Sequence, residues 1–341
     1  MRPADALRRI ADLLEAEGAN AYKPQAFRRA ASAVDAAGEE RVAVLNGRGQ
    51  LETLEGIGKS TAAVISQVLA GAVPEYLEEL GSRAHNLPPG PARALRELLR
   101  GDCHSHSDWS DGGSTIEEMA LAARDAGHEY LVLTDHSPRL KVAHGLSADA
   151  LRSQMALVSQ LNADLAPFRL LTGIEVDILE DGRLDQEEDL LAALDVVVAS
   201  VHSELRMAGD MMTARMVAAV QGPNVDILGH CTGRRLGARP RPQSSFDPET
   251  VFSACAASGT AVEINSRPDR RDPPPPLLRV AAQLGCSFSI DSDAHAPGQL
   301  SWLYMGCEQA VEVGIEPESI VNTLPLEEFL AWAGKSKGPL G

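Results

Sequence analysis

The stretch GDCHSHSDWSDG, residues 101–112, places two histidines and three aspartates within a few residues of one another. His104 and His106 are separated by a single residue, and Asp108 and Asp111 follow them. Imidazole nitrogens together with carboxylate oxygens are common protein ligands of Zn, Mn and Fe, whereas Mg and Ca prefer all-oxygen sites. The stretch therefore raises the hypothesis of a divalent-metal site.

Residues of the same kinds recur along the chain, in or directly after short apolar runs. In a parallel barrel the loops that follow the strands form one face, so side chains at the ends of different strands meet there. The runs cover residues 129–135, 169–179, 194–201, 225–229, 260–265 and 286–291. The residues that we expect to meet are His104, His106, Asp111, His136, Glu175, His202, His230, Asp293 and His295.

The elements that would position these residues are strands alternating with helices. Residues 114–127 illustrate the helical segments, because Thr115 and Glu118 have the spacing of a capping box just before an apolar periodicity. Such alternation indicates parallel βα units, and about seven of them favour a barrel over an open sheet. The sequence thus predicts an α/β fold with a barrel behind residue 100.

A single histidine at a strand end is more often a satisfied polar residue than a ligand. Here, however, six of the nine histidines occupy such positions, together with three acidic residues. Gathering them in one cavity without cations would be destabilising, so we interpret the set as a cluster of bound divalent ions. We expect His85 and His128 at the surface, His144 in a loop above the site as a substrate contact, and Cys103 and Cys231 as packing residues.

The first part of the chain has a different pattern. Apolar residues recur at helical spacing in 4–18, 24–38 and 60–71, and Gly and Pro cluster from 81 to 91 before a short basic helix. We therefore predict three regions: a helical domain over 1–82, a linker over 83–100 and the barrel over 101–341.

Charge and composition narrow the protein class. The net charge of −17 arises after residue 100, because residues 1–100 hold 13 basic and 13 acidic residues. We expect the acidic barrel to meet a polyanion only through metals or a helper module. Five scattered cysteines, no signal-peptide pattern and no membrane-length apolar run favour a cytoplasmic protein that does not enter a membrane.

The motifs HSH, SDG, TDHS, GIE, SVH, GH and DAH together resemble the polymerase and histidinol phosphatase (PHP) family over about residues 101–335. The resemblance implies a distorted (β/α)7 PHP barrel with three divalent metal ions, of Zn, Mn or Fe. By resemblance, one ion is held by His104, His106, Glu175 and Asp293; the second by Glu175, His202 and His230; the third by Asp111, His136 and His295.

Further segments, such as TDHSPRLKVAHGLS and EINSRPDRRD, are similar to the PHP domain of bacterial family X DNA polymerases. This similarity implies that Arg270 holds a substrate phosphate, while Cys231 replaces a proline usual in that family. The front resembles the amino-terminal helix-hairpin-helix module of the same polymerases, through NAYKPQAFRRAASAV and LEGIGKSTAAVI. The implied DNA contacts are Lys23, Arg28, Arg29, Gly56, Gly58 and Lys59.

Two parts of those polymerases are missing. The short interval between residues 80 and 104 leaves no room for a polymerase palm, and Val64 stands where the Schiff-base lysine of the module is expected.

Residues 56–58, the GIG turn, have an alternative interpretation that stays open, namely a helix turn in a protein-binding bundle.

The resulting hypothesis is a metal-dependent phosphoesterase acting on DNA, a 3′-to-5′ exonuclease or end-processing enzyme in repair, without polymerase or lyase activity. Glu175, His104 and Asp293 would be central to catalysis. Asp108 and Asp135 would at most support the metal ligands from outside the ligand set. A small-molecule phosphatase of the histidinol-phosphate or nucleotide type is the alternative, and a non-catalytic DNA-binding adaptor is the third. The native metal and the oligomeric state are left open.

Overall fold

The computed structural model describes residues 1–18, 22–84, 88–237 and 239–336. The chain divides into two compact units. The first comprises Met1–Pro88 with Pro297–Gln299, and the second comprises Pro89–Ala296 with Leu300–Gly341. Each unit has its own buried apolar core.

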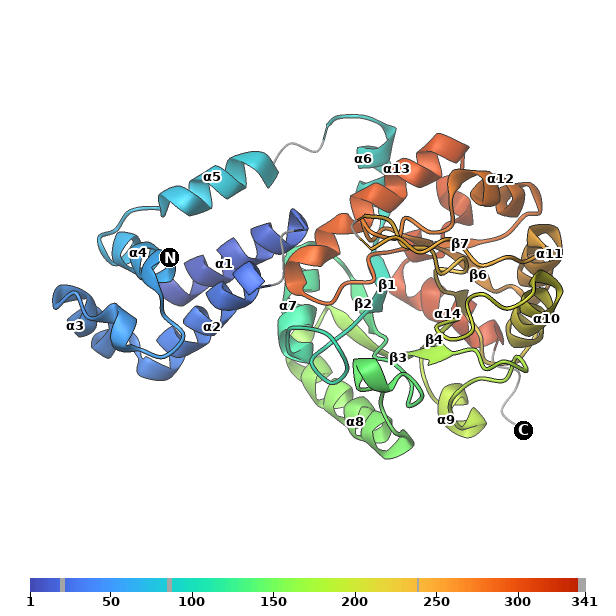
Figure 1. Ribbon diagram of the computed structural model, residues 1–341, viewed down its shortest axis with the longest axis horizontal. Helices are drawn as coiled ribbons and strands as arrows, with labels where there is room; N and C mark the ends of the chain where they lie inside the picture. Colours follow the sequence, from blue (N-terminus) through green and yellow to red (C-terminus); the bar gives the residue numbers. More distant parts are fainter. Residues whose placement is uncertain (19–21, 85–87, 238, 337–341) are drawn as a thin grey trace. The chain divides into compact units, whose positions relative to one another are not determined.

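The first unit is helical (Figure 1). Leu7, Ile10 and Leu14 line one face of its first helix and are at most 3% exposed, and they belong to one core with Phe27 and Ile65 of two later helices. The predicted all-α front domain is therefore confirmed. Its elements are α1 (Pro3–Ala16), α2 (Tyr22–Ala37), α3 (Glu39–Gly47), the 3-10 turn η1 (Leu51–Thr53), α4 (Lys59–Leu69) and α5 (Glu75–Ala84).

The second unit is built on seven parallel strands that pair in chain order. All five residues of the fourth strand, VVVAS, are buried, as expected for a strand with one face inside a barrel and the other under helices. The strands are β1 (Gly101–Ser105), β2 (Tyr130–Leu133), β3 (Arg169–Asp177), β4 (Val196–Ser200), β5 (Ile227–Leu228), β6 (Ala261–Asn265) and β7 (Phe288–Asp291).

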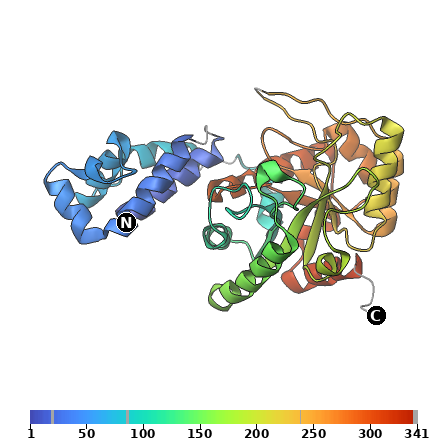
Figure 2. The same cartoon turned by 60° about the horizontal axis from the view of Figure 1, so that its bottom comes forward.

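Helices cover the outside of these strands (Figures 1 and 2). The predicted capping box is present, because the Thr115 hydroxyl accepts the Glu118 N–H and the Glu118 carboxylate accepts the Thr115 N–H. None of the helices described in either unit is long and apolar enough to cross a lipid bilayer. The helices of the second unit are α6 (Pro91–Leu98), α7 (Ile116–Asp125), α8 (Ala148–Leu165), α9 (Glu188–Ala192), α10 (Gly209–Val220), α11 (Pro248–Ser258), α12 (Pro275–Gln283), α13 (Leu303–Val313) and α14 (Leu326–Ser336), with the 3-10 turns η2 (Lys141–Ala143), η4 (Pro317–Ser319) and η5 (Val321–Thr323).

The first and last strands are joined by a polar side chain. Asn322 of η5 is fully buried, and its amide nitrogen donates to the carbonyl oxygens of Gly101 at 3.0 Å and Ile290 at 2.7 Å. Its amide oxygen accepts the N–H of Ile290 at 3.1 Å. The N–H of His106 donates to the carbonyl of Ala294 at 2.8 Å just beyond the strands. Together these bonds nearly close the seven strands, which confirms the predicted distorted (β/α)7 barrel.

The helix placed in the expected linker packs within the second unit. Ala92, Leu95 and Leu99 belong to the main core of the barrel unit, whose first residue is Pro89. The basic helix after the Pro-rich turn is therefore part of the barrel unit, and a fragment intended to preserve this core has to include it.

Candidate metal centre

The structure brings all nine predicted metal ligands of the barrel together at the carboxyl ends of the strands. Glu175 lies in β3 and is 1% exposed. The other eight side chains come from β1 and from the loops that follow β1, β2, β4, β5 and β7. They are His104, His106, Asp111, His136, His202, His230, Asp293 and His295.

Glu175 is the centre of the cluster, because five imidazoles surround its carboxylate. One oxygen lies close to the rings of two histidines and the other lies close to three. The distances are 2.7 Å to His230 Nε2 and 3.2 Å to His202 Nε2 from Oε1, and 2.9 Å to His136 Nδ1, 3.3 Å to His104 Nε2 and 3.6 Å to His106 Nε2 from Oε2.

Asp111 forms a second focus nearer to solvent. Its Oδ1 lies 3.4 Å from Nε2 of His136 and 3.4 Å from Nε2 of His295, and its side chain is 35% exposed. Three overlapping groups in the cluster have the geometry to hold one ion each. They are His106 with Asp111, His136 and His295; His104 with His106 and Glu175; and His136 with Glu175 and His202.

The donor atoms fit divalent cations. Buried polar atoms without a partner are rare in folded proteins, and the cluster concentrates several of them. Lone pairs of neutral imidazoles beside ionised carboxylates are the donor set of Zn, Mn and Fe sites. In this cluster, the buried imidazole nitrogens without a hydrogen-bond partner in the described part of the chain are Nε2 of His104, both nitrogens of His106, Nδ1 of His136, both nitrogens of His202 and Nδ1 of His230.

The cluster shifts the pKa values of its own members. Burial would raise the pKa of Glu175, but the surrounding imidazoles, His202 and His104 foremost, hold it well below its usual range. Burial, with the nearby His295, lowers the pKa of His106 well below its usual value. Burial would lower the pKa of His202, yet Glu175 and Asp177 raise it to about 9. Metal ligands must be deprotonated, so a cation that binds at His202 displaces a proton.

Glu263 supports the cluster from β6 and was missed by the sequence analysis. One of its oxygens lies 2.6 Å from Nδ1 of His104, and the other accepts the backbone N–H of His230. The contact directs Nε2 of His104 toward Glu175. Partners of this kind fix the orientation of a metal-binding ring. The available sequence signal was a carboxylate inside the apolar run TAVEIN.

Asp135 organises the loop after β1. Its carboxylate accepts the N–H and the hydroxyl of Ser107, at 2.8 and 2.6 Å, the hydroxyl of Ser110 at 2.5 Å and the side-chain amide of Gln154 at 2.7 Å. These bonds hold the loop that presents Asp111. Asp135 therefore supports the cluster from outside the ligand set, which is the largest role that the sequence analysis expected for it.

The glycine of the SDG motif is required by close packing in the same loop. A Cβ on Gly112 would lie 2.6 Å from the carbonyl carbon and oxygen of Ser107. Asp108, by contrast, is exposed, and its N–H donates to the carbonyl of Ser114.

Two arginines approach Asp293, whose backbone is left-handed with φ 53°. Arg270 Nε lies 3.0 Å from one carboxylate oxygen and Arg267 Nη1 lies 3.4 Å from the other. Arg270 is only 7% exposed, so its guanidinium is a buried positive charge beside the cluster. Its predicted role as a phosphate ligand stays a prediction, and Arg267 was not anticipated.

The remaining histidines differ in their outcomes. His144 is exposed at the end of η2 with φ 57°, and its predicted contact with substrate stays a prediction. The expectation that His128 lies at the surface is wrong. It is 5% exposed, its Nε2 lies 2.8 Å from Arg96 Nη2 of α6, and burial followed by the Arg96 charge lowers its pKa to about 3. His85 lies outside the described residues.

The predicted DNA-binding turn of the first unit is well formed. Ile57 is 7% exposed and anchors the turn in the core, while Gly56 and Gly58 on either side are exposed. Gly56 has φ +86°, which favours glycine. Helix α4 begins at Lys59, and the first backbone N–H groups of a helix have no intrahelical partner. This arrangement suits an anion, although DNA binding stays a prediction.

The three basic residues of α2 are not equivalent. Lys23 and Arg29 are exposed, and Lys23 Nζ contacts the Tyr76 hydroxyl and lies 4.7 Å from its ring centre. Arg28 is bound by Asp12 at 2.7 Å and by Glu15 at 2.6 and 2.8 Å, with its side chain 12% exposed. The structure thus gives Arg28 two carboxylate partners within the unit, and we remove it from the candidate DNA contacts.

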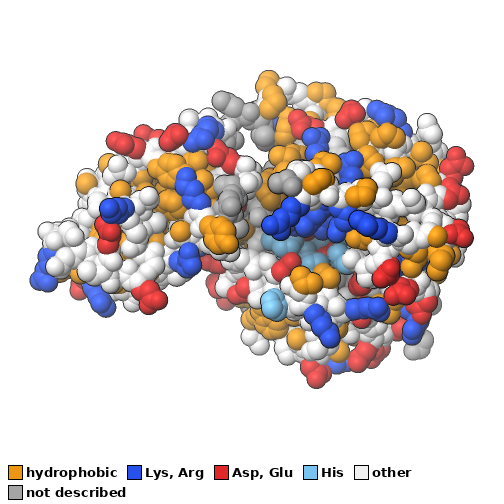
Figure 3. All heavy atoms as spheres, viewed as in Figure 1, with side chains coloured by type: hydrophobic (Ala, Val, Ile, Leu, Met, Phe, Trp, Pro, Cys, Tyr) orange, Lys and Arg blue, Asp and Glu red, His pale blue; other side chains and the backbone are white. Residues whose placement is uncertain are grey.

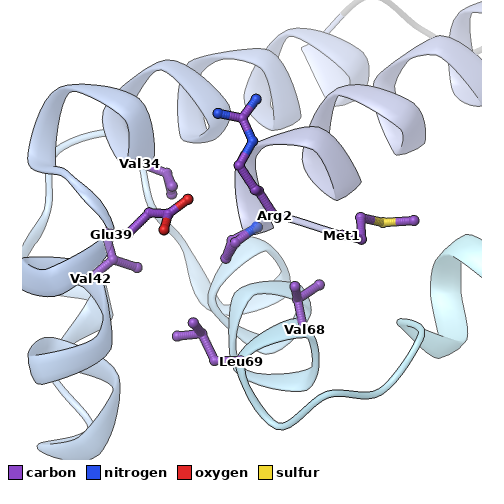
Figure 4. A pocket seen from close by; sticks show the side chains of 8 residues that line it. Met1, Arg2, Val34, Glu39, Val42, Val68 and Leu69 are labelled. Carbon is purple, nitrogen blue, oxygen red and sulfur yellow. The ribbon is translucent and has the colours of Figure 1, made fainter.

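The first unit also contains a hollow of about 240 Å³, formed by the start of α1 and parts of α2, α3 and α4 (Figure 4). Apart from Arg2 and Glu39 its lining is apolar, and none of the predicted site residues borders it. Its lining residues are Met1, Arg2, Pro3, Val34, Glu39, Val42, Val68 and Leu69.

Comparison with protein families gives one match within each unit. Residues 2–72 match the helix-hairpin-helix domain and residues 102–225 match the PHP domain. The chain therefore contains a helix-hairpin-helix domain followed by a PHP domain, in agreement with the resemblances in its sequence.

Two curated relatives illustrate the range of similar proteins. The chain is 37% identical over 260 residues to the DNA polymerase/3′-5′ exonuclease PolX of Bacillus subtilis, an alignment that covers 76% of this chain and 45% of that protein. It is 28% identical over 233 residues to a probable phosphatase of Thermoanaerobacter sp., covering 65% of this chain and 89% of the relative. The chain thus spans less than half the length of the polymerase.

Among solved structures, the chain is similar to a histidinol phosphate phosphatase of Lactococcus lactis, in complex with zinc, L-histidinol and phosphate. The TM-score is 0.48 and the identity 19%, over 64% of this chain and 95% of the other.

Proposed function

We propose that this protein, which carries a PHP domain behind a helix-hairpin-helix domain, is a metal-dependent phosphoesterase acting on DNA. It hydrolyses phosphodiester or 3′-end phosphoester bonds, as a 3′-to-5′ exonuclease or end-processing enzyme. Three divalent ions, of Zn, Mn or Fe, are bound by the nine clustered side chains. The observation that carries this proposal is the Glu175 carboxylate within 3.6 Å of five imidazoles, several of whose nitrogens lack a partner among the described residues.

The bound ions would lower the pKa of water toward 7 and neutralise the charge that develops on the leaving oxygen. Around them, the residues of the chain bind and orient the phosphate. Arg270 offers a guanidinium to its oxygens, and Glu263 and Asp135 hold His104 and the loop of Asp111 in place. A cysteine nucleophile does not fit this chemistry, because all five thiols are buried.

The helix-hairpin-helix domain would supply contacts to the DNA backbone. Gly56 and Gly58 expose the turn before α4, where backbone N–H groups and the Lys59 charge can meet a phosphate. Lys23 and Arg29 add exposed positive charge on α2. Such contacts position a strand without reading its sequence.

We also propose that polymerase and lyase activities are absent. Val64 is 3% exposed in the core of α4, at the position where the resemblance expects the Schiff-base lysine. Borohydride should therefore trap no adduct between this domain and an abasic site, and a trapped adduct on the first unit would refute the proposal.

A small-molecule phosphatase is the second candidate. It is favoured by the relatives described as probable phosphatases, of which this chain covers 89% in the first example. In that case the helix-hairpin-helix domain serves a purpose other than presenting substrate to the barrel.

The test compares the two substrate classes with the full-length chain. Metal-stripped protein, resupplied with Mn or Zn, is incubated with 5′-labelled DNA and, separately, with histidinol phosphate and p-nitrophenyl phosphate. We expect metal-dependent shortening of the DNA from its 3′ end. Turnover of the small esters with none on DNA would select the phosphatase. Hydrolysis of neither class with either metal would reject the enzyme and leave the DNA-binding adaptor.

A further inference from the structure

Arginines are concentrated beside the candidate metal centre. Figure 3 shows a band of basic side chains along a hollow in which histidine side chains are visible. The net charge of the whole chain, −17, does not reveal this local concentration of basic side chains. Seven of the 18 basic residues that follow residue 100 lie in two short segments: Arg234, Arg235, Arg239, Arg241, Arg267, Arg270 and Arg271.

Arg267 connects the cluster to this band. Its Nη1 lies 3.4 Å from Oδ1 of Asp293 and 3.3 Å from Nδ1 of His295, so its guanidinium borders two candidate metal ligands. Its Nε donates to Asp269 at 3.0 Å, and the other oxygen of Asp269 lies 3.8 Å from Nε of Arg235. Asp269 thus holds two guanidinium groups side by side, one at the cluster and one further out.

The loops that carry these arginines are tied to each other. Arg234 donates to the carbonyls of Arg270 and Arg271, and the N–H of Leu236 donates to the carbonyl of Asp269 at 2.7 Å. The buried Asp272 accepts the N–H of Thr232 at 3.1 Å. The loop after β5 and the loop after β6 therefore form one supported structure.

Within the two loops after β5 and β6, positive charge exceeds negative charge. Asp269 is shared by Arg235 and Arg267, and Asp293 is shared by Arg267, Arg270 and the candidate metal cluster. Burial lowers the pKa of Arg235, and the neighbouring Arg270 charge lowers it further. Nε of Arg235 is buried without a hydrogen-bond partner in the described residues. An anion placed between these guanidinium groups would relieve their mutual repulsion.

We propose that Arg267 and Arg235, paired by Asp269, form a second phosphate site next to the metal cluster. On the basis of the proposed function, this site takes the phosphate adjacent to the scissile one. It identifies the substrate class as a nucleic-acid strand end, in which consecutive phosphates follow one another. A phosphomonoester such as histidinol phosphate has no group to place there.

The test uses the full-length, metal-loaded protein and two oligonucleotides. Both have an ordinary 3′-terminal linkage, and the next linkage is either an ordinary phosphodiester or a neutral methylphosphonate. The measurement is kcat/KM for release of the terminal nucleotide. We expect the wild type to lose about tenfold with the neutral linkage, the scale of one hydrogen bond to a charged group. In R267Q and R235Q the two substrates should react at nearly equal rates.

The ratio between the substrates cancels any general loss of activity in a variant. R183Q is the matched control, since Arg183 is 79% exposed and pairs with Asp181 in the loop after β3. It should keep the wild-type ratio. If R267Q is inactive on both substrates, R235Q decides the question. Arg235 pairs with Asp269, which is not one of the nine cluster residues, whereas Arg267 contacts Asp293, which is.

Two negative results are distinguishable. Release of the terminal nucleotide by wild type at equal rates from both substrates, or a wild-type ratio in R235Q, would reject the second phosphate site alone. No release from either oligonucleotide would reject the proposed function, and the second phosphate site with it.

Discussion

In the first unit a largely buried arginine, Arg28, lies between the carboxylates of Asp12 and Glu15, whereas in the second unit a buried carboxylate, Glu175, lies among five imidazoles. The guanidinium of Arg28 forms short ion pairs with both carboxylates, which the unit supplies itself. Around Glu175, several imidazole nitrogens lack a partner in the described residues. Buried charge with complete pairing supports a fold, while buried donors left over after pairing indicate a ligand.

The largest expected effect of breaking this contrast is at Glu175. Glu175→Ala removes the carboxylate shared by the proposed ions, so metal-dependent hydrolysis should fall by about 1,000-fold or more, exceeding the usual cost of one oxyanion-hole donor. Bound metal, measured by elemental analysis, should fall with it, and far-ultraviolet circular dichroism should be retained. Glu180→Ala, an exposed position after the same strand, is the control. Full metal content and activity in Glu175→Ala would contradict the assignment.

Arg28→Ala should act on stability and leave the chemistry of the barrel intact. Removing one partner of a buried ion pair typically costs 3–5 kcal/mol, and we expect about 3 kcal/mol here. Hydrogen exchange of α1 and α2 would report the loss, while the three tryptophans, all in the second unit, would not. Arg41→Ala, at an exposed position of α3, is the comparison. Unchanged exchange in Arg28→Ala would show that the ion pair contributes little.

His128 gives the barrel unit a pH dependence. Its pKa is lowered to about 3 in the folded state, so the neutral form contributes stability that is present above the unfolded pKa of about 6.5 and is lost as pH falls toward 3. At pH 5 this loss amounts to about 2 kcal/mol relative to pH 7. Denaturant unfolding of His128→Gln, followed by tryptophan fluorescence, should show a decrease between these pH values that is smaller by that amount. Identical decreases in both proteins would disprove the role of His128.

The smallest expected effect concerns the helix-hairpin-helix turn. If Lys59 contacts one DNA phosphate, Lys59→Ala should weaken DNA binding by the full-length chain and reduce the slope of log affinity against log salt by about 1. Arg28→Ala should leave that slope unchanged, provided the measurement is made where the variant is folded. A salt slope unaltered by Lys59→Ala would exclude this contact.

The convergence of the nine cluster residues was predictable because a parallel barrel directs the ends of all its strands to one face. The apolar runs located the later strand ends, and the side chains at 136, 202, 230 and 295 followed, whereas His104 and His106 were identified by their spacing in residues 101–112. Their assignment to three ions stays a prediction, since convergence alone does not determine which atoms share an ion.

Contacts between loops were not predictable in the same way. Glu263 and Arg267 reach the cluster because neighbouring strands are in register and their loops are tied together. The spacing of residues in the sequence does not predict either feature. Likewise, the charge of Arg28 was visible in the sequence, but its neutralisation depends on how α1 packs on α2. His128 is buried because α6 packs Arg96 against it, and its position before a strand does not predict this burial.

The hydrogen bonds of Asn322 to Gly101 and Ile290 have a consequence for biosynthesis. Residue 322 follows all seven strands in the chain, so the bonds of its side chain between β1 and β7 become available last, after those of His106 to Ala294 and of Cys103 to Asp291. Contacts between such distant parts form slowly because loop entropy must be overcome first. Until then the edges of β1 and β7 expose unpaired backbone groups, at which nascent chains can associate with one another. Asn322 is therefore a position at which a substitution would lower the yield of folded protein even where the finished barrel tolerates it.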